Sequence, residues 1–105
     1  MAQAKIACQK LCFSNEEKML YEELRGKIFK ELVKIEELED GYTFVLEGKE
    51  HLLSDLVIWI PLEKKCCPFL KFTINIYHDD YLYLKLTGPD ETKQFLLLEL
   101  KLDQK

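Results

Sequence analysis

The residues with the most distinctive chemistry lie together in one short segment, Glu63-Lys64-Lys65-Cys66-Cys67-Pro68. Glu63, Cys66 and Cys67 stand at positions i, i+3 and i+4, so on a helix the carboxylate lies beside both thiols. One oxygen and two sulfur ligands can therefore converge. Cys8 adds a third sulfur if the N-terminal segment folds back over this helix. This segment is the candidate functional site.

Zinc is a poor fit to the segment, because structural zinc takes four tetrahedral ligands, usually from two separated cysteine pairs. Cys66 and Cys67 are adjacent and diverge by about 100 degrees on a helix. A soft thiophilic metal or metalloid ion fits better, since two or three thiolates bind it tightly once they have deprotonated. The predicted ligands are Cys66, Cys67, Glu63 and Cys8.

Thiol redox chemistry is a second possibility. Reactive cysteines usually lie at a helix N-terminus, where the helix dipole stabilises the thiolate. Cys66 and Cys67 are instead expected at a helix C-terminus beside Glu63, and both surroundings disfavour a thiolate. Lys64 and Lys65 carry the opposite charge but are expected to point mostly away from Glu63. The structural alternative is that these cysteines fill core volume, as buried cysteines often do.

Composition predicts one soluble domain over residues 1–105, with residues 1–13 as an N-terminal arm. The chain is 48% hydrophobic and 32% charged, which excludes disorder and a membrane protein. Its longest apolar runs, 56–62 and 95–98, are far shorter than the roughly 20 residues that span a bilayer. A net charge of -4 argues against nucleic acid as a partner. No secretory signal is recognisable, so we expect a cytoplasmic protein.

The expected compartment also decides how the four cysteines are interpreted. In the cytoplasm they should be reduced, and are then buried apolar residues, metal ligands or reactive thiols. In a secreted protein, a disulfide from Cys8 or Cys12 to Cys66 or Cys67 would become the leading alternative.

The first half of the chain predicts a helix followed by a hairpin. Ser14 and Glu17 have the spacing of a capping box, so a helix should begin near residue 15. Residues 33–47 then alternate as two strands around Asp40-Gly41, whose glycine should supply a positive φ in the turn. The apolar stripe of the helix is expected to contain Leu20, Tyr21, Leu24, Ile28 and Leu32.

The helix that carries the candidate site is expected over residues 51–66. Pro61 lies inside it and removes a backbone donor, so we expect a kink or a break near Val57. Pro68 disfavours a helical conformation at Cys67, so the helix should end there. The residues at helical spacing are Leu52, Leu56, Trp59, Glu63 and either Cys66 or Cys67.

The second half ends in a hairpin and a helix. The aliphatic residues of strands 72–76 and 82–86 share a face only if Ile76 lies opposite Leu82. Gly88-Pro89 should open the last helix, with proline at its first position. Its apolar side is expected from Phe95, Leu96, Leu98, Leu100 and Leu102. The order α-β-β-α-β-β-α predicts a two-layer α+β fold, with about four antiparallel strands and the helices on one face.

The segment Trp59-Ile60-Pro61-Leu62-Glu63-Lys64-Lys65-Cys66-Cys67-Pro68-Phe69-Leu70-Lys71-Phe72 resembles an uncharacterised group of small bacterial proteins. Their pattern runs W-x(3)-E-x-x-C-C-P-F-L-x-F and ends in an L-T-G-P element, here residues 86–89. Asp40-Gly41-Tyr42 and Cys8 are further matches, whereas Pro61 and Cys12 depart from the pattern. The resemblance implies a bacterial-type cytoplasmic protein and carries no activity with it.

Other residues offer weaker candidates. His51 and His78 are expected to be solvated, and Asp79-Asp80 is explained by a polar turn better than by a hard cation. No Ser/His/Asp order or glycine-rich phosphate loop occurs, which favours a non-catalytic role. The outward sheet face, which carries Tyr77, Tyr81 and Tyr83, is a possible homodimer surface.

Two functional hypotheses follow from these patterns. The first is a thiol-dependent protein that binds a soft metal or metalloid ion, or senses redox state, through Cys66 and Cys67. The second is a non-catalytic interaction module or homodimer with structural cysteines.

Overall fold

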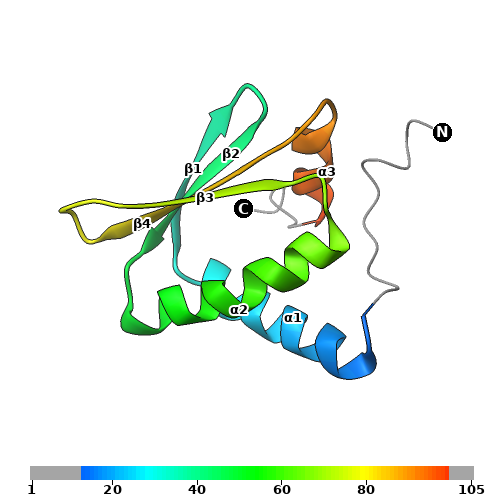
Figure 1. Cartoon of the computed structure of the whole chain (residues 1–105). Helices are drawn as coiled ribbons and strands as arrows, with labels where there is room; N and C mark the ends of the chain where they lie inside the picture. The colour runs from blue at the N-terminus through cyan, green and yellow to red at the C-terminus, as the bar shows by residue number, and fades with distance from the viewer. Residues whose placement is uncertain (1–12, 100–105) are drawn as a thin grey trace.

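A computed structural model describes residues 13–99 of the chain as three helices on a four-stranded antiparallel sheet (Figure 1). The strand order is β1-β2-β4-β3, so the two hairpins meet along β2 and β4. The predicted α+β fold and element order are confirmed. The elements are α1 (Asn15–Phe29), β1 (Leu32–Leu38), β2 (Gly41–Glu47), α2 (Glu50–Cys66), β3 (Lys71–Ile76), β4 (Tyr81–Thr87) and α3 (Thr92–Glu99).

Helix α1 begins with the predicted capping box. The Glu17 backbone N–H donates to Ser14 Oγ at 3.1 Å, and the Ser14 N–H donates to Glu17 Oε1 at 3.0 Å. The buried stripe is narrower than predicted, because Leu20 is 40% exposed and Leu32 already belongs to β1. Tyr21, Leu24 and Ile28 form the buried face, and Leu20 lies about 100 degrees round the helix from Tyr21.

The first hairpin has the predicted strands but a different role for its glycine. No glycine in the described chain has a positive φ, so Gly41 does not provide the expected turn conformation. Gly41 instead begins β2, where it pairs with Thr87 of β4. A Cβ placed on it would lie 1.9 Å from the carbonyl oxygen of Leu86. This glycine therefore permits close approach of two strands.

Helix α2 runs without a break through Pro61, so of the expected kink or break near Val57 the break is wrong, and the kink stays a prediction. Val57, whose carbonyl would bond to the missing N–H, is 63% exposed, and water can satisfy that carbonyl. The helix ends as predicted, with Cys67 as its C-cap before Pro68. The predicted face is buried: Leu52, Leu56, Trp59, Glu63 and Cys66.

The second hairpin has the predicted pairing of Ile76 with Leu82. Helix α3 begins later than predicted, at Thr92, because Glu91 takes a left-handed conformation with φ 74° just before it. Pro89 is therefore not its first residue.

The apolar side of α3 also differs from the prediction. Leu96 is fully buried, but Leu98 is 77% exposed, because the helix packs against the sheet along the Leu96 side. Leu100 and Leu102 lie outside the described residues.

All three helices contribute to one core against the inward face of the sheet. Figure 1 shows α1 and α2 together on one side of the strands. Trp59 of α2 is fully buried and contacts two aromatic rings of α1. Its ring centroid lies 6.1 Å from that of Tyr21 and 5.8 Å from that of Phe29, the last residue of α1. Within residues 13–99, none of the helices has the length and apolar character needed to cross a membrane.

Candidate functional site

The predicted site lies at the C-terminal end of α2 and is enclosed. Glu63, Cys66 and Cys67 each have an exposed fraction of 0%. The helical spacing brings Glu63 and Cys66 to the core side of α2. At the helix end, the Cys67 N–H donates to the Glu63 carbonyl at 2.7 Å. The site is thus held by the last turn of a long helix.

A hydrogen bond between two helices holds the carboxylate of Glu63. The Tyr21 hydroxyl of α1 donates to Glu63 Oε1 at 2.6 Å, and the bond is buried. Removing a carboxylate from water is costly unless hydrogen bonds replace its hydration. The sequence pattern predicts Tyr21 only as part of an apolar stripe. A polar partner for its hydroxyl could have been predicted, since a buried tyrosine hydroxyl usually needs one.

The two sulfur atoms are in different chemical states. Cys66 is disulfide-bonded, and the Cys67 Sγ lies 3.5 Å from the Cys66 Sγ without being part of a disulfide. The expectation that all cysteines are reduced is therefore wrong for Cys66. Cys8 and Cys12 lie outside the described residues, as does the predicted arm over residues 1–13, apart from Phe13.

Both cysteines are fully enclosed, and neither Cys66 nor Cys67 is exposed. The turn after α2 explains this, because the Leu70 N–H donates to the Cys67 carbonyl at 3.1 Å and brings a buried leucine over the helix end.

The lysines of the segment point outward, as predicted. Lys65 forms an ion pair with Glu17 of α1 at 3.0 Å, and Lys64 reaches the Leu70 carbonyl at 3.5 Å. The pKa of Glu17 is lowered, first by its hydrogen bond from the Ser14 backbone and then by Lys65.

Within residues 13–99, no group of three or more His, Cys, Asp or Glu side chains is arranged to hold a metal ion. Cys66 in a disulfide also lacks the thiolate that a soft ion needs. The described site is therefore a thiol beside a disulfide.

The chain matches no family model, no curated protein and no solved structure. Function must therefore be argued from the site itself.

A second polar cluster, which the sequence analysis missed, lies at the start of α2. Both ring nitrogens of His51 face carboxylates, with Nδ1 2.7 Å from Asp55 Oδ2 and Nε2 3.2 Å from Glu31 Oε2. Only the protonated ring can donate from both nitrogens. The pKa of His51 is accordingly raised from 6.5, first by the hydrogen bond to Asp55 and then by that to Glu31.

This cluster predicts pH-dependent stability. Because folding raises the pKa of His51, its stabilising effect is fully present below about pH 6.5 and is lost as the pH rises through the folded-state pKa. Urea unfolding of wild type and His51→Gln should therefore differ most near pH 6, and least at a pH above the raised folded-state pKa of His51. His78→Gln is the matched control, and an equal difference at both pH values would contradict this assignment.

The acidic turn and the tyrosines form a third polar region. Asp79 accepts hydrogen bonds from the Tyr83 hydroxyl at 2.7 Å and the Tyr81 N–H at 3.1 Å. The hydrogen bond to Asp79 is the largest cause that raises the pKa of Tyr83 to about 12. Asp79 thus organises a polar turn.

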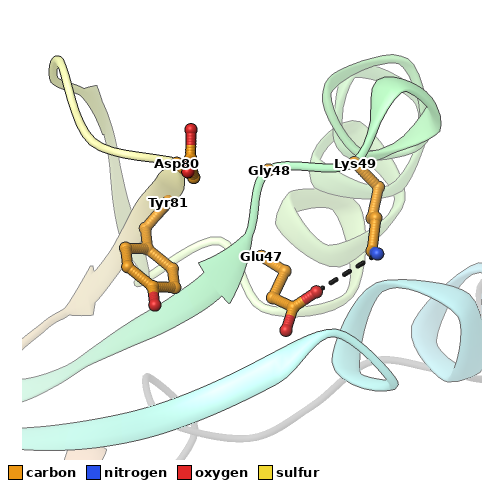
Figure 2. Close-up of a pocket in the computed structure, with 5 residues that line it drawn as sticks. All are labelled: Glu47, Gly48, Lys49, Asp80 and Tyr81. Carbon is orange, nitrogen blue, oxygen red and sulfur yellow. Dashed lines mark ion pairs between the residues drawn. The ribbon is translucent and has the colours of Figure 1, made fainter.

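An open pocket of about 410 Å³ lies beside this turn, and Figure 2 shows the residues that line it. Glu47 and Lys49 form an ion pair across 3.2 Å in it, and Asp80 and Tyr81 lie on the opposite wall. The charges of this pocket are mixed and solvated, so it is a weaker candidate than the enclosed thiol and disulfide.

Proposed function

We propose that this protein is a non-enzymatic, redox-responsive thiol protein. The observation that carries the proposal is the 3.5 Å separation between the Cys67 sulfur and the disulfide-bonded Cys66 sulfur. Thiol–disulfide exchange needs a thiolate next to a disulfide sulfur. Here the Cys67 thiol, from which the thiolate would form, already lies against the Cys66 sulfur, and neither residue is exposed.

The internal step conserves atoms and electrons. Cys67 loses its proton and attacks the Cys66 Sγ, a Cys66–Cys67 bond forms, and the earlier sulfur–sulfur bond of Cys66 breaks. The released cysteine leaves as a thiolate and takes up a proton. An external dithiol can then reduce the disulfide, supplying two electrons and two protons while forming its own disulfide.

The test is the midpoint potential of the Cys66 disulfide. The protein is equilibrated in dithiol–disulfide buffers, quenched with acid and alkylated, and its peptides are analysed by mass spectrometry. A responsive disulfide should have a midpoint between about -180 and -300 mV, the range of cellular thiol pools. A midpoint far below about -300 mV would make the bond purely structural and would contradict the proposal.

Cys67→Ala is the matched variant for the exchange step. It should retain the Cys66 disulfide but lose every peptide in which Cys66 is joined to Cys67. If the wild-type protein shows no Cys66–Cys67 linkage at any potential, Cys67 takes no part in the exchange step. The peptides joined to Cys66 also identify which cysteine is its partner.

A soft metal or metalloid ion is the second candidate, for the reduced protein. Two sulfur atoms that bind one metal ion tetrahedrally at about 2.3 Å each lie about 3.8 Å apart. The Sγ atoms of Cys66 and Cys67 are 3.5 Å apart, which is close to that value. We expect one Cd²⁺ or arsenite per reduced chain, with proton release and weaker binding by Cys66→Ser, Cys67→Ser and Glu63→Gln. The absence of stoichiometric binding in the reduced protein would remove this candidate.

The alternative function is an interaction module with structural cysteines. Its specific support is the outward sheet face, where Tyr77 is 60% exposed and packs edge to face against Tyr83 at 5.2 Å. A homodimer through Tyr77, Tyr81 and Tyr83 should be weakened by Tyr83→Glu. We also propose that the protein has no nucleic-acid partner and lies in the cytoplasm. We propose in addition that it is related to the bacterial group with the Cys-Cys-Pro-Phe motif.

A further inference from the structure

The two edges of the sheet differ in how they are protected. Strand β1 carries three charged residues, Lys34, Glu36 and Glu37, and its register shifts between Leu32 and Lys34. Charges and bulges are the usual devices that stop an edge strand from pairing with another chain. In addition, Lys93 of α3 forms an ion pair with Glu37. The β1 edge is therefore blocked.

Strand β3, at the other edge, has none of these devices. After Lys71 its sequence is Phe72-Thr73-Ile74-Asn75-Ile76, which contains no charge, proline or glycine. Its register with β4 is regular over its whole length. Among the described strands, none pairs with its outer side. An uncharged, regular edge rich in β-branched residues is a ready template for a further strand.

Helix α2 lies along β3 in the second layer. At one end, Leu53 and Ile76 line the same pocket of about 260 Å³. At the other end, Lys64 reaches the Leu70 carbonyl and lies 6.0 Å from the centre of the Phe72 ring. Figure 1 shows α2 beneath β3. The helix and the strand therefore form one side of the molecule together.

This side presents apolar side chains from both layers. On α2, Leu53 is 44% exposed and Val57 is 63% exposed, and exposed Pro61 follows at the same spacing of four residues. On β3, Ile76 is 60% exposed, and the side chains of Phe72 and Ile74 are partly exposed. We call these six residues the edge surface: Leu53, Val57, Pro61, Phe72, Ile74 and Ile76.

We propose that the edge surface binds a second copy of this chain by antiparallel pairing of β3 with β3. A twofold axis normal to the sheet through Ile74 places Phe72 of each copy opposite Ile76 of the other. Residues directly opposite in antiparallel strands lie on the same face, so apolar side chains meet apolar side chains. The sheet becomes continuous across both copies, with the helices on the same side.

Charge at the ends of β3 identifies a second copy as the occupant. Lys71 lies at the start of β3, and Asp79 and Asp80 lie just beyond its end. Antiparallel pairing brings the basic end of one copy to the acidic end of the other, twice per dimer. The uncharged centre is self-complementary. A stable interface buries about 1,200 Å² or more in total, so the α2 residues must add to the strand contact.

Sedimentation equilibrium tests the dimer, both with and without a reductant so that the result does not depend on the disulfide. Wild type should form a dimer of 12.5 kDa chains at micromolar concentrations. Ile76→Lys should raise the dissociation constant at least about tenfold, because it places a charge opposite Phe72 of the other copy, in an apolar contact. Val57→Lys should do the same. Both residues are exposed, so neither change should disturb folding. Met19→Lys, which alters an exposed residue of α1, is the matched control.

Amide hydrogen exchange gives an independent readout. Diluting the protein should accelerate exchange of the β3 amides that face outward and leave the β1 amides unchanged. A wild-type monomer at all concentrations would overturn the proposal. So would a dimer that dissociates with Tyr83→Glu but not with Ile76→Lys or Val57→Lys, because that pattern would assign the interface to the outward sheet face.

Discussion

Gly41→Ala should abolish stable folding, with an expected loss of more than about 4 kcal/mol of unfolding free energy. A Cβ at this position would lie 1.9 Å from the Leu86 carbonyl oxygen and 2.8 Å from Thr87 Cα. Both atoms belong to the backbone of β4, so no side-chain rotation can relieve the clash. Strands β2 and β4 join the two hairpins, and separating them would disrupt the core between sheet and helices.

Gly26→Ala is the matched control for that variant. Gly26 lies inside α1, and nothing lies within 4 Å of an added Cβ. Replacing a helical glycine by alanine should stabilise the protein by about 0.5–1 kcal/mol. Urea unfolding measures both changes. A Gly41→Ala protein within about 1 kcal/mol of wild type would show that the Gly41–Thr87 pairing is not as tight as described.

Tyr21→Phe should cost about 2–3 kcal/mol, because it removes the 2.6 Å hydrogen bond to the fully buried Glu63 carboxylate. The phenylalanine ring keeps the stacking on Trp59, so the loss measures the hydroxyl. Thermal and urea unfolding at neutral pH give the value. Tyr77→Phe, at an exposed position, is the control and should change stability by less than about 0.5 kcal/mol.

A double-mutant cycle with Glu63→Leu separates the pair from its surroundings. If the hydroxyl acts through the carboxylate, the double variant should lose less than the sum of the single losses, with a coupling of about 1–3 kcal/mol. Additive losses would mean that Tyr21 stabilises the core by packing alone. The cycle also shows whether the helix contact that supports the cysteines depends on this hydrogen bond.

The order and type of the elements could be predicted because local rules decide them. The Ser14 and Glu17 capping box fixed the start of α1, and the spacing from Leu52 to Cys66 fixed the buried face of α2. The pairing of Ile76 with Leu82 followed from strand alternation. In each case the physical cause lies within a few residues of the chain, where sequence patterns are informative.

The sequence-based predictions were wrong where a distant contact or the solvent overrode a local rule. The sequence predicts a turn conformation for Gly41, but a glycine is needed there because the backbone of β4, about 45 residues away in the chain, leaves no room for a Cβ. Pro61 predicts a kink or a break in α2, but the exposed carbonyl side and the buried opposite face let the helix continue without a break. Glu91 delayed the start of α3 through a left-handed backbone, which glutamate rarely adopts.

For the candidate site, the sequence by itself determined that Glu63, Cys66 and Cys67 share one end of a helix, because a helix fixes the positions of i, i+3 and i+4. Only the tertiary structure decided that this end is buried and that Tyr21 from another helix donates to Glu63. It also decided that Cys66 is in a disulfide while Cys67 is not. These properties depend on which segments meet in space, and residues 42 positions apart carry no periodic signal of their contact.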